Sequence, residues 1–279
     1  MASYLHPETM TDALGAIGAG TRILAGGTDL YPATQNATLA GDVMDLMALP
    51  NLRGIMQTDQ GLRIGACTTW TEIARAALPP ALTALQQAAL QVGGVQIQNA
   101  GTIGGNLCNA SPAADGVPPL LAVDAVVELV SATGVRVLSL QDFLLGPRKT
   151  ARLPDEIMTA IVIPNTALEG HSTFIKLGAR AYLVISIAMV AARITARDGK
   201  ITGAALAVGA CSATALRIRR VEGALVGQSL ENAAATINAA DVAAALSPMD
   251  DLRATAAYRT HAAAELLRRA VTETCKALA

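Results

Sequence analysis

Thr102-Ile-Gly-Gly-Asn-Leu-Cys-Asn-Ala-Ser-Pro-Ala-Ala-Asp115 is the most informative stretch of this sequence. Glycine has no Cβ, so the Gly104-Gly105 pair permits positive φ and lets a large ligand approach the backbone. We expect a concavity rich in hydrogen-bond donors, which suits a diphosphate, from the N–H groups of these glycines, the hydroxyl of Thr102 and the amides of Asn106 and Asn109. The carboxylate of Asp115 is suited to accept a hydrogen bond from a sugar hydroxyl, as the acidic residue of dinucleotide-binding folds does. The stretch therefore predicts a nucleotide cofactor.

A second glycine segment lies upstream. Residues 22–25 predict a short apolar strand, which runs into Gly26-Gly27-Thr28-Asp29. Thr28 is a plausible N-cap for a short helix through Leu30 and Tyr31. A strand, a glycine turn and a helix in this order often bind an anion. Taken alone, residues 25–28 are equally compatible with a tight turn between packed elements, and residues 101–105 with a loop that crosses over a strand. Neither segment matches the Walker A or GxGxxG pattern.

Composition and charge exclude several classes of function. The chain has 279 residues, which suits one large domain or two ordinary ones. A net charge of −1 and 3% aromatic residues argue against nucleic-acid binding, which usually relies on a basic surface and on aromatic rings that stack on the bases. The 4 cysteines are scattered without a CxxC pair and the 3 histidines are dispersed, so we expect no metal site within this chain.

The sequence also lacks membrane and secretion signals. Its best apolar run, from Leu183 to Ala192, is too short for a membrane span. The residues after Met1 lack the basic flank and apolar core of a secretory signal. We therefore expect a cytoplasmic protein.

The hydrophobic pattern predicts an α+β region of about 165 residues and a smaller α+β region after it. In the first region we expect helices over residues 7–19, after Thr68 or Thr69, and over about 80–92, with strands at 42–47, 61–65, 125–130, 135–138 and 157–163. Residues 164–170 read as a linker. Beyond them, Asp198-Gly199 predicts a tight hairpin turn between strands at about 185–196 and 201–208. Helices follow from residue 216, and the longest covers about 250–278.

Several blocks of the sequence resemble one known family when they are read together. Gln96 to Asp115 and Ile23 to Leu30 closely resemble the FAD-binding subunits of molybdenum hydroxylases, the family of xanthine dehydrogenase and carbon monoxide dehydrogenase. The resemblance continues through Asp155-Glu-Ile-Met158, Phe174 to Arg180 and Tyr258-Arg259. It covers nearly the whole chain, and chance agreement of separate blocks in the same order is rare.

The resemblance implies a fold and its domains. The fold is α+β: a two-lobed FAD-binding fold of the vanillyl-alcohol-oxidase (PCMH) type, followed by a smaller flavoprotein C-terminal domain. The expected FAD-binding domain covers residues 1–165, with lobes of about 1–55 and 56–165. The C-terminal domain is expected over residues 171–279.

The resemblance also implies the residues that contact FAD. They are Ile23, Leu24, Ala25, Gly26, Gly27, Thr28, Asp29, Leu30, Val92, Thr102, Ile103, Gly104, Gly105, Asn106, Asp115, Met158 and Lys176. Arg180 and Tyr182 belong to a segment that borders the flavin in relatives and would govern access of the electron acceptor. The residues themselves leave other interpretations open. Asp115 could instead cap a helix that begins near Val117, and Lys176 could be a solvent-exposed residue of a strand.

The implied function is electron transfer rather than substrate chemistry, so no catalytic residue is expected. Electrons would reach FAD from the [2Fe–2S] clusters of a small partner subunit and leave to a terminal acceptor. A large molybdopterin subunit would oxidise the substrate, for which a purine or another N-heterocycle is the candidate, within a dimer of heterotrimers. Two alternatives remain at this point: a stand-alone FAD-dependent oxidase of the same fold superfamily, and a nucleotide-binding scaffold without enzymatic activity.

Overall fold

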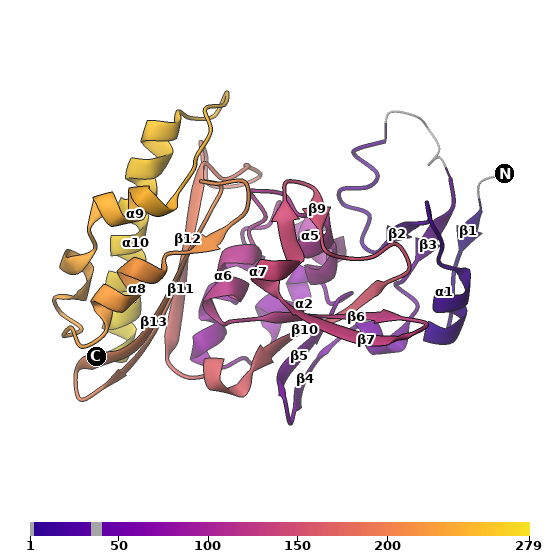
Figure 1. Cartoon of the computed structure of the whole chain (residues 1–279), viewed down its shortest axis with the longest axis horizontal. Helices are drawn as coiled ribbons and strands as arrows, with labels where there is room; N and C mark the ends of the chain where they lie inside the picture. Colours follow the sequence, from indigo (N-terminus) through magenta and orange to yellow (C-terminus); the bar gives the residue numbers. More distant parts are fainter. Residues whose placement is uncertain (1–2, 35–40) are drawn as a thin grey trace.

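The computed structural model describes residues 3–34 and 41–279. These residues form four sheets, and the three larger ones follow one another along the long axis of the molecule, from the N-terminal lobe to the yellow C-terminal helix (Figure 1). Within the described part of the chain, no helix combines the length and the apolar character that a membrane crossing requires.

The N-terminal lobe is a small parallel sheet with one helix. Its strands have the order β1-β3-β2, and the elements are β1 (Tyr4–Leu5), α1 (Met10–Ala16), β2 (Arg22–Leu24) and β3 (Val43–Asp45). Helix α1 is shorter than the expected 7–19, because the Thr9 side chain accepts a hydrogen bond from the N–H of Asp12 and so sets the helix start. Ala13 of α1 and Met44 of β3 are both buried in the core of this lobe.

The second sheet is antiparallel and has five strands in the order β4-β5-β10-β6-β7. They are β4 (Ile55–Thr58), β5 (Gly61–Gly65), β6 (Val126–Ser131), β7 (Gly134–Ser139) and β10 (Ile157–Pro164). The expected strands at 61–65 and 157–163 and the hairpin between 125 and 138 are confirmed. Strand β10 occupies the centre of the sheet, and seven of its eight residues are buried.

Short helices pack around this sheet, and most of them contribute buried residues to the main core that they form with it. They are η1 (Pro50–Leu52), α2 (Trp70–Arg75), η2 (Pro80–Leu82), α3 (Thr83–Ala89), α4 (Val95–Ala100), α5 (Ile103–Asn109), α6 (Val117–Ala122) and α7 (Leu140–Phe143). Thr69 begins α2 through a capping box with Glu72, which confirms the expected cap. The helix expected over about 80–92 is instead a 3₁₀ turn followed by α3.

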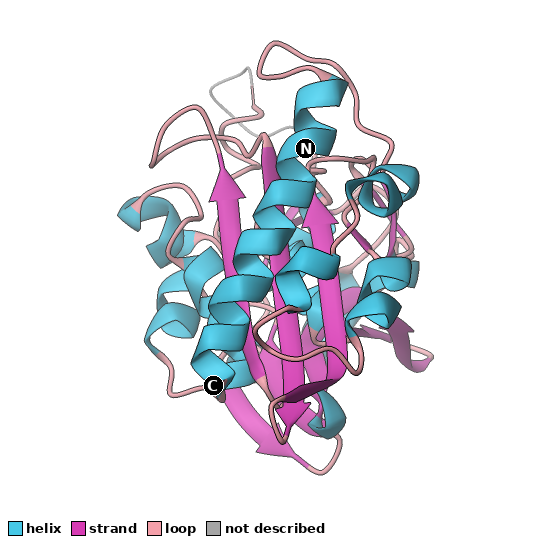
Figure 2. Ribbon diagram, turned by 90° about the vertical axis from the view of Figure 1, so that its left-hand side faces the viewer, coloured by secondary structure: helices cyan, strands magenta, loops and turns pink. Residues whose placement is uncertain are grey.

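The C-terminal part is a four-stranded antiparallel sheet with helices on its outer face (Figure 2). After η3 (Asn165–Ala167) come β11 (His171–Leu177), β12 (Ala188–Arg197), β13 (Lys200–Gly209), β14 (Leu216–Arg217), α8 (Arg219–Leu225), η4 (Ala233–Thr236), α9 (Ala239–Ala245) and α10 (Ala256–Leu278). Asp198 and Gly199 both have positive φ between β12 and β13, so the predicted hairpin turn is confirmed.

The inner face of this sheet packs on helices of the first region. Ala84 and Ala88 of α3 and Ala122 of α6 are buried against Phe174 of β11 and Met189 of β12. Ala191 of β12 and Ala205 of β13 are buried in the same cluster. One helical layer therefore lies between the five-stranded and four-stranded sheets.

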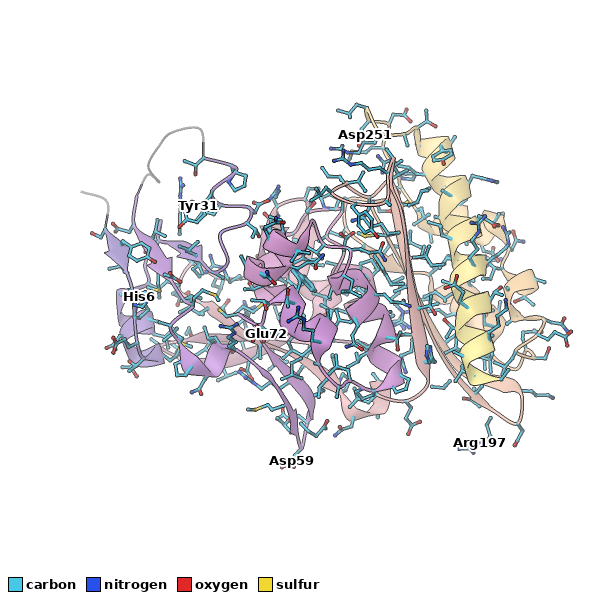
Figure 3. The ribbon with its side chains drawn as sticks, turned by 180° about the vertical axis from the view of Figure 1, so that it is seen from behind. His6, Tyr31, Asp59, Glu72, Arg197 and Asp251 are labelled. Carbon is cyan, nitrogen blue, oxygen red and sulfur yellow. The ribbon has the colours of Figure 1, made fainter. Side chains whose placement is uncertain are left out.

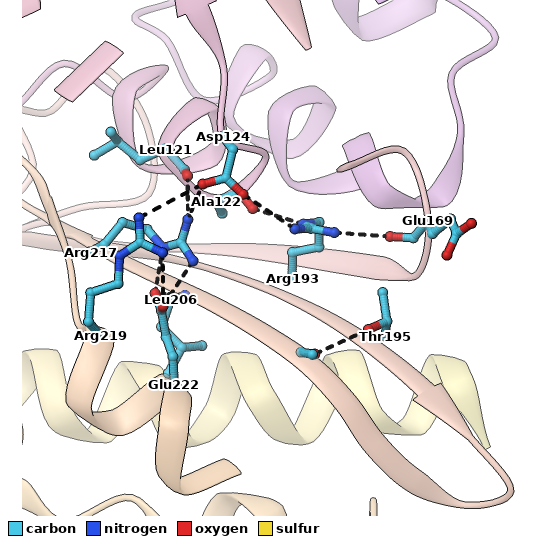
Figure 4. A network of polar contacts seen from close by, with 11 residues as sticks. Leu121, Ala122, Asp124, Glu169, Arg193, Thr195, Leu206, Arg217, Arg219 and Glu222 are labelled. Atoms are coloured by element: carbon cyan, nitrogen blue, oxygen red, sulfur yellow. Dashed lines mark hydrogen bonds and ion pairs between the residues drawn. The ribbon is translucent and has the colours of Figure 1, made fainter. Parts of the chain in front are cut away.

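A network of charges joins the same two regions at the end of α6 (Figure 4). Arg217 donates from Nη1 to Oδ1 of Asp124 at 2.7 Å and to the carbonyl of Leu121 at 3.0 Å. Its other nitrogens pair with Glu222, and Arg193 donates to the carbonyl of Ala122 at 2.8 Å. The Arg217 and Glu222 side chains are buried, so each ion needs the other to offset its lost hydration.

Candidate cofactor-binding site

A cavity of about 540 Å³ lies between the N-terminal lobe and the helical layer. The turn after β2, helix α5 and the hairpin of β8 (Leu144–Gly146) and β9 (Lys149–Thr150) contribute most of its lining. Figure 1 shows α5 beside β9. The predicted residues that line it are Ile23, Leu24, Ala25, Gly26, Gly27, Thr28, Asp29, Leu30, Val92, Thr102, Gly104, Gly105, Asn106 and Met158.

The turn after β2 presents free backbone donors. Within residues 3–34 and 41–279, the N–H groups of Ala25 to Leu30 have no hydrogen-bond acceptor. Gly27 has a φ of +69°, which favours glycine, and the N–H of Tyr31 donates to its carbonyl. Tyr31, which Figure 3 labels in the N-terminal lobe, lies in a turn, so the short helix predicted from Thr28 is wrong. Successive free N–H groups in a turn bind anions.

The two glycine segments contact each other. A Cβ on Gly26 would lie 1.7 Å from the carbonyl oxygen of Ala100, and a Cβ on Gly101 would lie 3.2 Å from Oγ1 of Thr28. Only glycine at residue 26 allows the turn after β2 to approach the end of α4 this closely. Both glycine segments therefore line the same cavity.

Helix α5 corrects the interpretation of the downstream glycines. Thr102 is its N-cap, and the Thr102 hydroxyl accepts from the N–H of Gly105 at 3.1 Å. The N–H of Gly104 donates to Ala66 at 2.8 Å, and that of Ile103 donates to Thr68 at 3.0 Å. The prediction that these glycines offer free donors with positive φ is therefore wrong, because the Thr102 cap and the carbonyl of Ala66 accept their hydrogen bonds and neither glycine has a positive φ. A Cβ on Gly104 would lie 2.7 Å from the Ala66 side chain, so Gly104 permits helix packing.

Gly105 and Asn106, unlike the buried Gly104, offer features that a ligand in the cavity could use. Asn106 Oδ1 is a buried acceptor without a hydrogen-bond partner among the described residues. A buried acceptor without a partner is costly, and a donor group of a ligand would offset that cost. Gly105 is exposed in the cavity wall, so its missing side chain leaves room for a ligand.

Three predicted contact residues do not line the cavity. Ile103 is 0% exposed and belongs to the main core. Lys176 Nζ lies 2.7 Å from Oδ2 of Asp115, and the Ser186 hydroxyl donates to Oδ1 of the same carboxylate at 2.8 Å. Burial raises the pKa of Asp115, and the Lys176 charge opposes that rise. Gly116 rather than Asp115 is the N-cap of α6, so the alternative role of Asp115 as a cap is wrong.

Arg180 and Tyr182 lie in the exposed loop between β11 and β12. Arg180 donates from Nε to the carbonyl of Tyr182 at 2.9 Å and also to the carbonyl of Leu183. Tyr182 is 74% exposed. Neither residue lines the cavity, so their control of acceptor access stays a prediction.

The structure adds cavity residues that the sequence did not single out. Arg148, Thr150 and Arg152 come from the β8–β9 hairpin and its continuation, and Cys67 and Trp70 come from the segment after β5. Gly146-Pro147 before Arg148 signals a turn, but no periodicity shows where that turn packs. Only the fold brings this hairpin to α5.

The titratable groups of the cavity limit its chemistry. Burial raises the pKa of the Cys67 thiol to about 12 and that of the Cys108 thiol to about 11, so both are neutral near pH 7. Among the described lining residues there is no histidine. The cavity can therefore bind and orient a ligand, and Asp29, the one carboxylate among its described lining residues, is already paired with Arg148 at 2.9 Å.

Comparison with known proteins identifies the family. The family described as "FAD binding domain in molybdopterin dehydrogenase" matches residues 1–166. The chain belongs to this family of FAD-binding subunits. The family described as "CO dehydrogenase flavoprotein C-terminal domain" matches residues 173–274 of the subunit. These matches confirm the predicted family and FAD as the cofactor of this chain.

Individual relatives agree over almost the full length of this flavoprotein subunit. It is 31% identical over 283 residues to the putative xanthine dehydrogenase FAD-binding subunit of Escherichia coli strain K12, covering 98% of this chain and 95% of the relative. It is 32% identical over 273 residues to the carbon monoxide dehydrogenase medium chain of Afipia carboxidovorans, covering 96% and 94%. The relatives are oxidoreductase subunits, which confirms the predicted enzyme class.

A solved structure supports the fold of the subunit. Reconstituted CO dehydrogenase from Oligotropha carboxidovorans contains a chain with a TM-score of 0.91 and 30% identity, with 100% of this chain and 99% of that chain covered. The predicted two-part α+β flavoprotein fold is confirmed. The cavity suits FAD on physical grounds, because the free N–H groups of residues 25–30 match a diphosphate and Asn106 Oδ1 needs a donor.

Proposed function

We propose that the protein is the electron-transfer subunit of a molybdenum hydroxylase. It would take electrons from the [2Fe–2S] clusters of a small partner subunit and pass them to a terminal acceptor. A large molybdopterin subunit would oxidise the substrate, for which a purine or another N-heterocycle is our candidate. The observation that carries this proposal is the run of N–H groups from Ala25 to Leu30, which line the cavity and have no acceptor among the described residues.

FAD supplies the redox chemistry in such a subunit, because it accepts electrons singly and releases them as a pair. The residues of this chain hold the cofactor. The N–H groups of residues 25–30 suit the diphosphate, and Gly105 leaves space beside it. Val92 and Met158 add apolar surface to the same cavity and help to exclude water. No proton transfer by the protein is required in this role.

We propose the following contact set for FAD, which includes the three residues outside the cavity lining. It comprises Ile23, Leu24, Ala25, Gly26, Gly27, Thr28, Asp29, Leu30, Val92, Thr102, Ile103, Gly104, Gly105, Asn106, Asp115, Met158 and Lys176.

The assembly and domain limits are also proposals. We propose an FAD-binding domain over residues 1–165, with lobes of about 1–55 and 56–165, and a C-terminal domain over residues 171–279. The subunit would join the small and large partners in a cytoplasmic dimer of heterotrimers. The names of relatives support a multi-subunit enzyme, since one is a carbon monoxide dehydrogenase medium chain and another is a nicotinate dehydrogenase FAD-subunit.

The first experiment measures flavin binding by the purified full chain. We expect a yellow protein, or a colourless one that binds added FAD and quenches or shifts its fluorescence. Flavin content is determined by absorbance after denaturation. A folded chain that neither contains nor binds FAD would contradict the proposal.

A second measurement separates the subunit from a stand-alone oxidase. The chain is purified from its native source with its partners, and the metals and flavin are quantified. Candidate substrates are then added without oxygen, and the flavin absorbance is followed. We expect bleaching only in the complex. Equal bleaching of the isolated chain would favour the stand-alone oxidase.

A further inference from the structure

Three side chains from separate segments meet at the cavity. Arg148 Nη1 donates to Oδ2 of Asp29 at 2.9 Å and to Oδ1 of Asn109. Asn109 Nδ2 donates to Oδ1 of Asp29 at 3.0 Å. All three residues line the cavity, and the triad connects the β8–β9 hairpin, the end of α5 and the turn after β2.

The backbone around Arg148 is fixed without help from its side chain. Arg148 has a φ of +58°, and its N–H donates to the carbonyl of Ala110 at 2.9 Å. Ala110, which ends α5, is itself left-handed with a φ of +46°. A non-glycine residue with positive φ costs free energy and persists where the surrounding structure imposes it. The hairpin thus places this arginine at the cavity.

Charge in the cavity is concentrated on this group. The charged side chains among its described lining residues are Asp29, Arg148 and Arg152. Arg152 donates from Nη1 to the carbonyls of Leu153 and Glu156, at 3.0 Å and 2.6 Å. Arg148 uses Nη1 alone, so within residues 3–34 and 41–279 its Nε and Nη2 groups have no acceptor. Its side chain is 58% exposed, which leaves those donors accessible.

We propose that Arg148 binds the diphosphate of the cofactor and that Asp29 and Asn109 position its guanidinium. The proposal rests on the assignment of this cavity to FAD. Arginine binds phosphate oxygens with two parallel donors, and a fixed guanidinium loses less entropy in doing so. Asp29 is then a positioning residue. Its carboxylate would repel a diphosphate, and the ion pair with Arg148 offsets that repulsion.

The test compares FAD affinity in variants of the full chain, measured by flavin fluorescence. We expect Arg148→Gln to raise the Kd for FAD at least about tenfold, as for the loss of a hydrogen bond to a charged group. Arg53→Gln is the matched control. Arg53 pairs with Glu72, labelled in Figure 3, at 2.8 Å, has a similarly exposed side chain, and does not line the cavity. The Kd of this control should stay within twofold of the wild-type value.

Salt dependence distinguishes a phosphate contact from a purely structural role. Attraction between charges is screened by salt, so Arg148→Gln should flatten the dependence of the Kd on salt concentration. Asn109→Ala keeps the charge and should weaken binding less, with the wild-type salt dependence. Arg148→Lys keeps the charge without the two parallel donors and should give an intermediate Kd. If thermal melting shows that Arg148→Gln is unfolded, Arg148→Lys is used in its place.

Two results would overturn the proposal. One is a folded Arg148→Gln variant whose Kd lies within twofold of the wild-type value. The other is a weakened variant that retains the wild-type salt dependence and matches Asn109→Ala. If Arg148→Lys serves in its place, a wild-type Kd or a Kd equal to that of Asn109→Ala is the overturning result. A wild-type chain that does not bind FAD would instead contradict the proposed function.

Discussion

Glycines of similar appearance in the sequence have different tasks at the site. Gly26 allows a backbone contact with Ala100, Gly27 supplies a positive φ, and Gly104 allows α5 to pack on Ala66. Gly105 is exposed in the cavity wall. The space for a cofactor therefore depends on Gly105, while the other three glycines shape the protein around it.

This division predicts opposite defects for two neighbouring substitutions. In Gly104→Val the new side chain meets Ala66, so we expect the chain to lose about 2 kcal/mol or more of folding free energy from overpacking. In Gly105→Val the new Cβ meets only Oγ1 of Thr102 at 2.9 Å, so we expect a folded protein that has lost FAD binding. Thermal melting and flavin content measure the two effects. Equal stability of the two variants would contradict the assignment.

The sequence predicted which segments line the site, but it did not predict the physical role of each residue in them. Glycine pairs point to close approach, and this allowed both segments to be identified. The sequence does not show which partner a backbone N–H takes. The donors of Gly104 and Gly105 are used by Ala66 and Thr102, and the free donors lie in the turn after β2. Arg148 was missed because its contacts come entirely from distant segments.

Elements with strong local signals were predicted well. The Asp198-Gly199 turn, the Thr69 cap and the strands at 61–65 and 157–163 depend on neighbouring residues, and all are present. The glycine-rich stretch is different, because α5 forms where glycine disfavours a helix. Its Thr102 cap and tertiary packing of Ile103 and Leu107 in the core outweigh that preference.

The buried pair of Asp115 and Lys176 joins β11 to the start of α6. Its side chains are only 8% and 6% exposed. Lys176→Met would leave the carboxylate buried without its cation, so we expect a loss of about 3 kcal/mol in folding free energy. Adding Asp115→Asn should restore much of that loss, because it removes the unpaired charge. Urea unfolding of the single and double variants tests this, and simple addition of the two losses would contradict it.

At the scale of the whole molecule, Asp124 links the first α+β region to the C-terminal part through ion pairs. Its carboxylate lies 2.7 Å from Arg217 Nη1 and within 4 Å of Arg193 and Arg219, all three from the C-terminal part (Figure 4). Asp124 has a φ of +50°, which asparagine also tolerates. The amide is therefore a fair probe of the charge alone.

We expect Asp124→Asn to lower the free energy of unfolding by about 1–2 kcal/mol, since Arg217 is buried and loses a charged acceptor. Limited proteolysis between residues 164 and 171 should become faster as the two regions separate more often. Glu265→Gln, which breaks an exposed pair with Arg269 within α10, should change stability by less than about 0.5 kcal/mol. Equal effects of the two substitutions would show that Asp124 does not join the regions.

The central place of β10 has a consequence for how this protein is made. The hairpins β4–β5 and β6–β7 are each local, but Ala160 of β10 pairs with both Gly65 and Glu128. Until β10 leaves the ribosome, the nascent chain therefore carries two hairpins with open edges. Pairings so distant along the chain are slow to form, and open edges favour aggregation during translation. A pause in translation after β10 has emerged from the ribosome would give the five-stranded sheet time to close.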